Sequence, residues 1–335
     1  TAIASGGQST AVGFISKSTG FASNAIGGYS VAAGDFSTAV GSGARAEKTS
    51  DLAAGQGAIA SGGQSTAVGL DSKSTGFASN AIGTTSLAKG DFSTAVGSEA
   101  HAAADYTLAA GFNAIASGEQ STAVGFNSKS TGFASNAIGN SSLAEGELST
   151  AVGQEAHAAA DYTLAAGLNA IASGEQSTAV GFKSKSTGFA SNAIGGSSLA
   201  EGDFSTAVGQ EAHAAADYTL AAGFKAIASG EQSTAVGQQA HAAAGYTLAA
   251  GFNAIASGEQ STAVGFNSKS TGLASNAIGN SSLAEGELST AVGYQAHAKA
   301  GYTLAAGFNA IASGEQSTAV GFNSKSTGLA SNAIG

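Results

Sequence analysis

The segment that decides the fold covers residues 122–177 and reads TAVGFNSKSTGFASNAIGNSSLAEGELSTAVGQEAHAAADYTLAAGLNAIASGEQS. It consists of four 14-residue repeats of the general form x-Ala-(Val/Ile/Ala)-Gly-x-x-(Ala/Ser)-x-(Ala/Ser)-x-Gly-x-x-(Ser/Thr), which we name first to fourth type in this order. The same register runs from Thr10 to Asn332 over 23 repeat steps, and the four types recur with a superperiod of 56 residues. Such self-similarity is the signature of a stacked repeat architecture.

The register survives a deletion. After the fourth-type repeat at Leu220 a third-type repeat follows at Thr234, so two repeats, or 28 residues, are missing without a shift. A linear stack tolerates this loss because each repeat contacts only its neighbours. We therefore expect one continuous array of about 23 coils over residues 1–335. The chain contains no Met and both ends cut through a repeat, so we expect it to be a fragment of a longer protein.

Hydrophobic and small residues alternate with a period of two inside each repeat. Positions 14, 2 and 4 (Ser, Ala, Gly) form one alternating set, and positions 7, 9 and 11 (Ala, Ala, Gly) form another. Each set indicates a short strand with small side chains on one face. Positions 5–6 and 12–13 then form the turns. The sequence predicts an all-β fold, a parallel β-roll or solenoid with two strands per 14-residue coil.

Positions 1 and 3 of each repeat point away from this narrow interior and carry the larger aliphatic residues. Where position 3 is the small residue Ala, as at Ala54 and Ala110, position 1 is the large residue Leu. Such compensation of side-chain volume is typical of a tightly packed surface. If this row were exposed to solvent, its contiguous apolar area would be larger than that on the surface of a typical soluble monomer. We therefore predict an interface between chains, formed by Val12, Ile26, Val40, Leu52, Val68, Ile82, Val96, Leu108, Val124, Ile138, Val152, Leu164, Val180, Ile194, Val208, Leu220, Val236, Leu248, Val264, Ile278, Val292, Leu304, Val320 and Ile334.

Composition excludes several classes of protein. The chain has 50 Gly but no Pro and no Gly at every third position, which excludes collagen. The absence of Cys excludes disulfides, thiolate metal sites and a Cys nucleophile. A net charge of −10 argues against nucleic acid and anionic membranes as partners. No apolar run approaches the length of a membrane-spanning helix.

Chemically active side chains recur identically along the array, which argues against catalysis. The five histidines all occupy position 8 of third-type repeats, and we interpret them as a solvated ladder whose members lie too far apart to share a metal: His101, His157, His213, His241 and His297. No His or Ser is placed to form a triad with the recurring carboxylates, such as Glu99, Glu155, Asp161, Glu201 and Asp203. A catalytic site needs one unique concave pocket. We predict no catalytic, cofactor-binding or metal-binding residue and no enzyme activity.

Two surface features point to contacts with a partner. Position 8 of first-type repeats carries a lysine ladder that is either a solvated row or a periodic docking site for an acidic matrix partner: Lys17, Lys73, Lys129, Lys185, Lys269 and Lys325. Position 8 is Leu or Ile in other types, and aromatic residues such as Phe126, Phe133, Tyr162 and Phe204 stand in the turns. These rings either form a sticky surface or pack on neighbouring turns.

The repeats TAVGFNSKSTGFAS, NAIGNSSLAEGELS and TAVGQEAHAAADYT resemble the head repeats of the YadA-like trimeric autotransporter adhesins, over essentially the whole chain. The resemblance implies a left-handed parallel β-roll, with three chains packed around an axis through the aliphatic position of AVG and AIG. Departures also occur: Ala104 replaces the second Gly in a third-type repeat, and the repeat at Thr38 carries Arg45 and Lys48.

The resemblance further implies the function. We expect the head of a homotrimeric bacterial surface adhesin, extracellular and anchored to the outer membrane by a C-terminal region outside this chain. It would attach multivalently to extracellular matrix proteins, cells or abiotic surfaces, because many weak contacts add up to avidity. Two alternatives stay open: the shaft of a phage tail fibre or extracellular filament, and an ice-binding solenoid. The latter requires a regular Thr array, which position 1 breaks with Asn and Leu.

Overall fold

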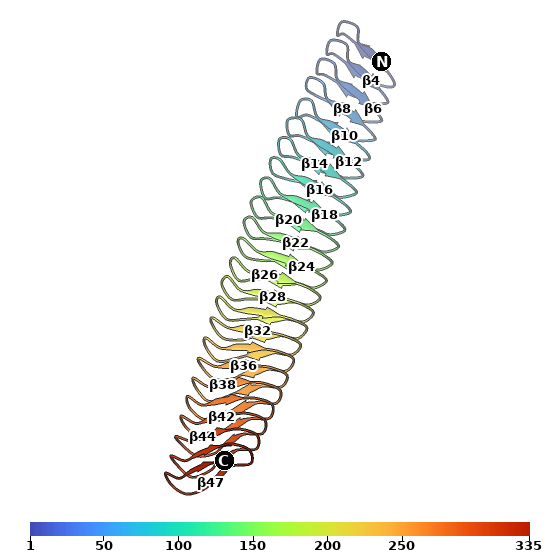
Figure 1. Ribbon diagram of the computed structural model, residues 1–335. Helices are drawn as coiled ribbons and strands as arrows, with labels where there is room; N and C mark the ends of the chain where they lie inside the picture. Colours follow the sequence, from blue (N-terminus) through green and yellow to red (C-terminus); the bar gives the residue numbers. More distant parts are fainter. The chain divides into compact units, whose positions relative to one another are not determined.

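The computed structural model describes residues 1–335, and these divide into two compact units, Thr1–Asn169 (the N-terminal unit) and Ala170–Gly335 (the C-terminal unit). Every regular element is a β-strand of two or three residues. Within each unit the chain runs through successive two-stranded coils that stack on one another (Figure 1). The protein is therefore a parallel β-solenoid with a 14-residue coil, as the repeat pattern predicts.

The N-terminal unit contains twelve odd-numbered strands of two residues and twelve even-numbered strands of three residues. Its odd-numbered strands are β1 (Ile3–Ala4), β3 (Lys17–Ser18), β5 (Val31–Ala32), β7 (Arg45–Ala46), β9 (Ile59–Ala60), β11 (Lys73–Ser74), β13 (Leu87–Ala88), β15 (His101–Ala102), β17 (Ile115–Ala116), β19 (Lys129–Ser130), β21 (Leu143–Ala144) and β23 (His157–Ala158). Its even-numbered strands are β2 (Thr10–Val12), β4 (Asn24–Ile26), β6 (Thr38–Val40), β8 (Leu52–Ala54), β10 (Thr66–Val68), β12 (Asn80–Ile82), β14 (Thr94–Val96), β16 (Leu108–Ala110), β18 (Thr122–Val124), β20 (Asn136–Ile138), β22 (Thr150–Val152) and β24 (Leu164–Ala166).

The C-terminal unit repeats this arrangement. Its odd-numbered strands are β25 (Ile171–Ala172), β27 (Lys185–Ser186), β29 (Leu199–Ala200), β31 (His213–Ala214), β33 (Ile227–Ala228), β35 (His241–Ala242), β37 (Ile255–Ala256), β39 (Lys269–Ser270), β41 (Leu283–Ala284), β43 (His297–Ala298), β45 (Ile311–Ala312) and β47 (Lys325–Ser326). Its even-numbered strands are β26 (Thr178–Val180), β28 (Asn192–Ile194), β30 (Thr206–Val208), β32 (Leu220–Ala222), β34 (Thr234–Val236), β36 (Leu248–Ala250), β38 (Thr262–Val264), β40 (Asn276–Ile278), β42 (Thr290–Val292), β44 (Leu304–Ala306), β46 (Thr318–Val320) and β48 (Asn332–Ile334).

Strands pair in parallel with their equivalents one coil away, so each unit has one odd-numbered and one even-numbered sheet. The register is always 14 residues, as between Val124 of β18 and Ile138 of β20. It is unchanged where two repeats are missing, because Leu220 of β32 pairs with Thr234 of β34. The strand pairing at this place therefore follows the same 14-residue register as elsewhere in the unit.

The interior between the two sheets holds only small side chains. Its buried apolar residues are all Ala, and its buried polar residues are Ser and Thr together with one aspartate, Asp51. In first-type repeats the serines at positions 9 and 14 bond across this interior, as Ser74 Oγ and Ser79 Oγ do at 2.6 Å. Position 14 also closes its own turn, since Ser79 Oγ donates to the carbonyl of Gly76 at 2.7 Å. These hydroxyls are thereby satisfied without large side chains, whereas the buried Oγ atoms of Ser177, Ser205, Ser289 and Ser317 have no hydrogen-bond partner.

The turns fall at the predicted positions and have a common backbone geometry. Positions 6 and 13 adopt a left-handed conformation in every coil, as in Asn127 (φ 53°) and Tyr162 (φ 58°). Such values are uncommon for residues other than Gly. They aim the N–H at the preceding coil, where Tyr162 N–H donates to the carbonyl of Glu147 at 2.8 Å. An intercoil hydrogen bond thus offsets the backbone strain of each turn.

Glycine at position 4 is required by close approach of successive coils. Gly125 has φ 135°, and a Cβ added there would lie 2.3 Å from the carbonyl oxygen of Gly139 in the next coil. The same clash recurs along the stack, which explains why position 4 is Gly in every complete repeat. Gly is required at position 4 because the backbones of successive coils lie too close together to leave room for a Cβ atom.

Candidate functional site

The predicted interface residues all lie on the even-numbered strands, with their side chains outside the small interior. They are half-exposed or exposed in the chain: 41% of Ile138, 39% of Val152 and 37% of Leu164 remain accessible. Their register is continuous within each unit, because Ile138 pairs with both Val124 and Val152. The sheet therefore presents an uninterrupted apolar row that no segment of this chain covers.

The predicted lysine ladder lies on the other sheet. Lys17, Lys73, Lys129, Lys185, Lys269 and Lys325 each begin an odd-numbered strand, and each is exposed. Position 9 beside them is buried, so position 8 faces outward as expected. Between lysines the ladder carries half-buried Leu, His and Ile, as at Leu143, His157 and Ile115. The two sheets thus present chemically different faces.

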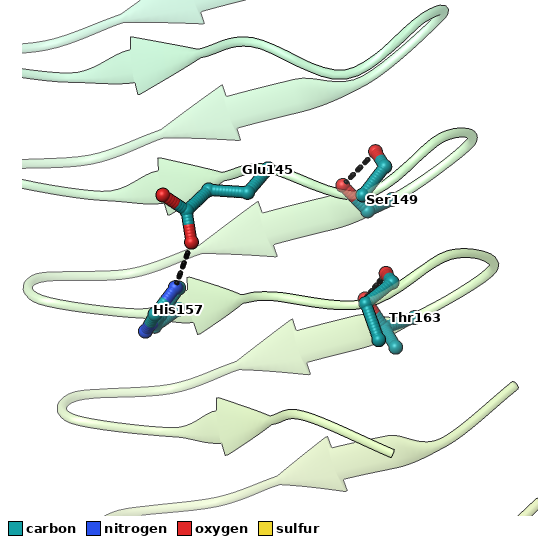
Figure 2. Close-up of polar contacts among 6 residues, drawn as sticks. Glu145, Ser149, His157 and Thr163 are labelled. Atoms are coloured by element: carbon teal, nitrogen blue, oxygen red, sulfur yellow. Dashed lines mark hydrogen bonds and ion pairs between the residues drawn. The ribbon is translucent and has the colours of Figure 1, made fainter. Parts of the chain in front are cut away.

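Three of the five histidines on this outer face pair with carboxylates and remain partly accessible to solvent. His157 Nε2 lies 2.8 Å from Glu145 Oε2 in the preceding coil, as Figure 2 shows. The same contact joins His213 to Glu201 at 2.8 Å and His297 to Glu285 at 2.7 Å. Position 8 of one coil therefore meets position 10 of the coil before it, a juxtaposition that spacing along the sequence does not reveal.

The remaining two histidines lack this partner. His101 has Lys89 at the equivalent place, and its Nε2 is buried without a hydrogen bond. Burial, and then the positive charge of Lys89, lower the pKa of His101 below its usual 6.5. For His241 the equivalent residue is Ser229. The five histidines thus have three different environments although their strands are equivalent.

Turn aromatics pack on one another along the stack and also remain accessible. Phe112 and Phe126 stack with ring centroids 5.3 Å apart, and Phe204 and Tyr218 stack at 5.2 Å. Phe126 is still 50% exposed and Tyr162 54%. Stacking accounts for some of the aromatic surface, and the exposed remainder is available to a partner.

Aspartates at position 12 link the second turns of neighbouring coils. Asp161 Oδ1 accepts the backbone N–H of Glu147 at 2.8 Å, and Asp203 Oδ1 accepts that of Phe189 at 2.8 Å. The Asp residues thus have a structural role in the turn, whereas the side chain of Glu155 contacts only that of its neighbour Gln154, at 3.3 Å. No group of three or more His, Asp or Glu side chains is arranged to hold a metal ion.

One buried polar residue, Asp51, departs from the repeat pattern. Asp51 is 1% exposed, and its carboxylate accepts hydrogen bonds from the N–H groups of Lys48, Gly63 and Ser65 and from the Ser65 hydroxyl, at 2.8–2.9 Å. Position 14 is Ser or Thr in every other complete repeat. That single exception was the signal in the sequence that could have located it.

Comparison with known proteins gives the family. The model of the YadA head domain repeat matches residues 18–44, 46–72, 74–100, 102–128, 130–156, 144–170, 158–184, 172–198, 186–212, 200–226, 228–254, 256–282, 284–310 and 312–335. The chain therefore belongs to the YadA head family, which is a family of adhesins and not of enzymes.

The chain is also similar to solved structures. The crystal structure of the collagen-binding domain of the Yersinia adhesin YadA is similar at 26% identity over 58% of this chain and 69% of that chain, with a TM-score of 0.21. A comparison with curated proteins finds no match. The structure has no helix long and apolar enough to cross a membrane.

Proposed function

We propose that this chain is the adhesive head of a homotrimeric bacterial surface protein. In this proposal it forms one continuous array, displayed outside the cell and attached to the outer membrane through a separate C-terminal region. The array binds extracellular matrix proteins, cells or surfaces through many equivalent contacts. The observation that carries the proposal is the chemical difference between the two sheets. The even-numbered sheet presents an uncovered apolar row, and the odd-numbered sheet presents a ladder of exposed lysines.

The apolar row supports assembly with further copies of the chain. Soluble monomers rarely expose contiguous apolar surface on this scale. The row is regular within each unit and formed by one aliphatic residue per coil, so an identical row on another copy matches it coil by coil. Three chains around one axis, as the family resemblance implies, would bury the row on every copy.

Native mass spectrometry tests the assembly. We expect a species of three times the chain mass of 31.8 kDa. Replacing Val124, Ile138 and Val152 with Asp should release monomers, because three carboxylates per chain would be buried without partners. The matched control replaces Leu87, Ile115 and Leu143, which lie on the other sheet, with Asp. A monomeric wild-type chain, or equal dissociation of both variants, would rule out this interface.

The lysine ladder supports multivalent attachment to an acidic partner. Lys17, Lys73 and Lys129 stand four coils apart, which is about 19 Å at the usual strand spacing. Lys269 and Lys325 have the same spacing, whereas Lys185 and Lys269 stand six coils apart. Each exposed lysine contributes a weak, salt-sensitive contact. Many such contacts on one partner raise the overall affinity without any single strong site.

A heparin column, as a polyanion probe, tests the ladder. Replacing Lys73, Lys129 and Lys185 with Ser should lower the salt concentration needed for elution. The control replaces Lys89, Lys225 and Lys299 with Ser, which removes the same charge from positions outside the ladder. Equal shifts in both variants would show a response to net charge alone and contradict a docking role for the ladder.

A further inference from the structure

The repeat pattern breaks at one place on the turn that carries positions 12 and 13. The repeat at residues 38–51 ends in Lys48, Thr49, Ser50 and Asp51, where other third-type repeats carry a small residue, Asp or Gly, Tyr and Thr. In the next repeat Gly63 stands where every other complete fourth-type repeat has Glu. Ser50 thus replaces a Tyr and Gly63 replaces a Glu, so each of these two consecutive turns lacks one large side chain that its repeat type otherwise carries.

The missing side chains leave a hollow of about 500 Å³, which we call the notch. Its lining includes Asp35, Lys48, Thr49, Gly63, Gln64 and Phe77. Asp35, Thr49, Gly63 and Phe77 occupy position 12 of four successive coils, so the notch extends over about 14 Å along the stack. Gly63 forms its floor: a Cβ there would lie 3.7 Å from the Phe77 ring and 3.9 Å from the Lys48 side chain.

The floor of the notch is held in place by the buried Asp51. Its carboxylate accepts the N–H of Lys48 on one side and those of Gly63 and Ser65 on the other, each at 2.8–2.9 Å. Hydrogen bonds to an ionised group are stronger than neutral ones. Asp51 thus joins the two altered turns, and its hydrogen bonds fix the backbone conformation that forms the floor of the notch.

The side chains around the notch combine one apolar surface with mixed polar groups. Phe77 exposes 40% of its surface beside the hollow. Lys48 and Thr49 offer donors, Asp35 an acceptor and Gln64 both. Lys48 and Asp35 have opposite charges, and Glu47 beside them is neutralised by Arg45 at 2.9 Å. The lining therefore suits an uncharged ligand with an apolar face and many hydroxyl or amide groups.

We propose that the notch binds a saccharide, with one or two uncharged hexose or N-acetylhexosamine rings. The C–H face of a sugar ring packs on the exposed Phe77 ring, and its hydroxyls reach Asp35, Lys48, Thr49 and Gln64. The volume of the notch and its lining of one aromatic ring with a few polar groups are within the range of small-molecule sites in proteins. The site is independent of the repeated lysine contacts, because the sequence Lys48–Asp51 occurs once in the chain.

Saturation-transfer NMR and calorimetry on the full chain test the proposal, with N,N′-diacetylchitobiose, N-acetyllactosamine and mannobiose as probes. At least one probe should bind, and Phe77→Ala should weaken that binding at least tenfold. The repeat supplies a matched control: Phe133 occupies the same position of the next first-type repeat and is 42% exposed. Phe133→Ala should change the affinity less than twofold.

A second variant fills the notch. Gly63 has φ 88°, and Asn is among the residues that best tolerate positive φ, so Gly63→Asn should place a side chain over the floor without unfolding the coil. It should abolish saccharide binding while circular dichroism stays unchanged. Absence of binding by all three probes, or equal losses in Phe77→Ala and Phe133→Ala, would overturn the proposal.

Discussion

The imidazole of His157 lies 2.8 Å from the carboxylate of Glu145, a residue twelve positions earlier in the neighbouring coil. The pair recurs wherever a Glu precedes the His by this interval, at His213 and His297. His101 has the same backbone setting but faces Lys89. The repeat thus provides natural variants of one site, in which a single side chain in the adjacent coil decides the electrostatic environment of the imidazole.

Lys89→Glu should convert His101 into a member of this set. The substitution replaces a repelling charge with an acceptor for the unpaired Nε2, so the pKa of His101 should rise. An NMR titration of the imidazole resonances measures the shift. Lys299→Glu, in a coil where His297 already has Glu285, is the control and should leave His101 unchanged. An unaltered pKa in Lys89→Glu would contradict the assigned cause.

His101 should also make a small contribution to the pH dependence of stability. Its folded-state pKa is lowered, so the unfolded chain takes up a proton near pH 6.5 while the folded chain stays neutral. This contribution is complete above pH 6.5 and is lost as the pH falls from 6.5 towards the folded pKa. The drop in melting temperature from pH 7.5 to 5.0 should be smaller in His101→Gln than in wild type. Equal drops would show that the contribution is absent.

Asp51→Asn should destabilise the coils that Asp51 joins. The amide keeps the size of the carboxylate but presents an NH₂ group to one of the backbone N–H donors that Asp51 accepts. A buried donor left unpaired costs about 1–3 kcal/mol, and the loss of charge weakens the other bonds. Hydrogen exchange of the Lys48, Gly63 and Ser65 amides should accelerate. Unchanged protection of all three would show that the carboxylate is not needed there.

Gly125→Ala should be strongly destabilising. The added Cβ would lie 2.3 Å from a carbonyl oxygen and the φ of 135° is accessible in practice only to Gly, so we expect a loss of about 2 kcal/mol or more. Thermal denaturation measures it. Gly196→Ala is the control, since the nearest atom to its added Cβ is 4.0 Å away, on the Gln210 side chain. Similar melting temperatures for the two variants would contradict the close-approach argument.

Most of the fold follows from the repeat itself. Alternation of small residues predicts both strands and their buried faces, and the structure has Ala at position 2 and Ala or Ser at position 9 inside. The turns at Asn127 and Ala134 also fall where the pattern predicts them. These features depend only on residues within one coil and recur in every coil. The consensus over many repeats therefore predicts them even though single repeats depart from it.

The contacts between coils were not predictable in the same way. The pairing of His157 with Glu145 depends on how position 8 is placed against position 10 of the preceding coil, which no period within one repeat specifies. The role of Asp51 is not predictable from the consensus for the opposite reason: Asp occurs only once at position 14, so the repeat pattern does not include it. Its importance emerges only when the N–H groups of two turns converge on one buried carboxylate.

The unchanged pairing of Leu220 with Thr234, across the place where two repeats are missing, has a genetic consequence. The chain contains identical copies of some repeats, such as NAIGNSSLAEGELS at residues 136–149 and 276–289. Misaligned recombination between such copies inserts or removes whole coils, and every junction reproduces contacts already present elsewhere. The number of lysines and histidines along the stack can thus change in a single inherited event that keeps the 14-residue register.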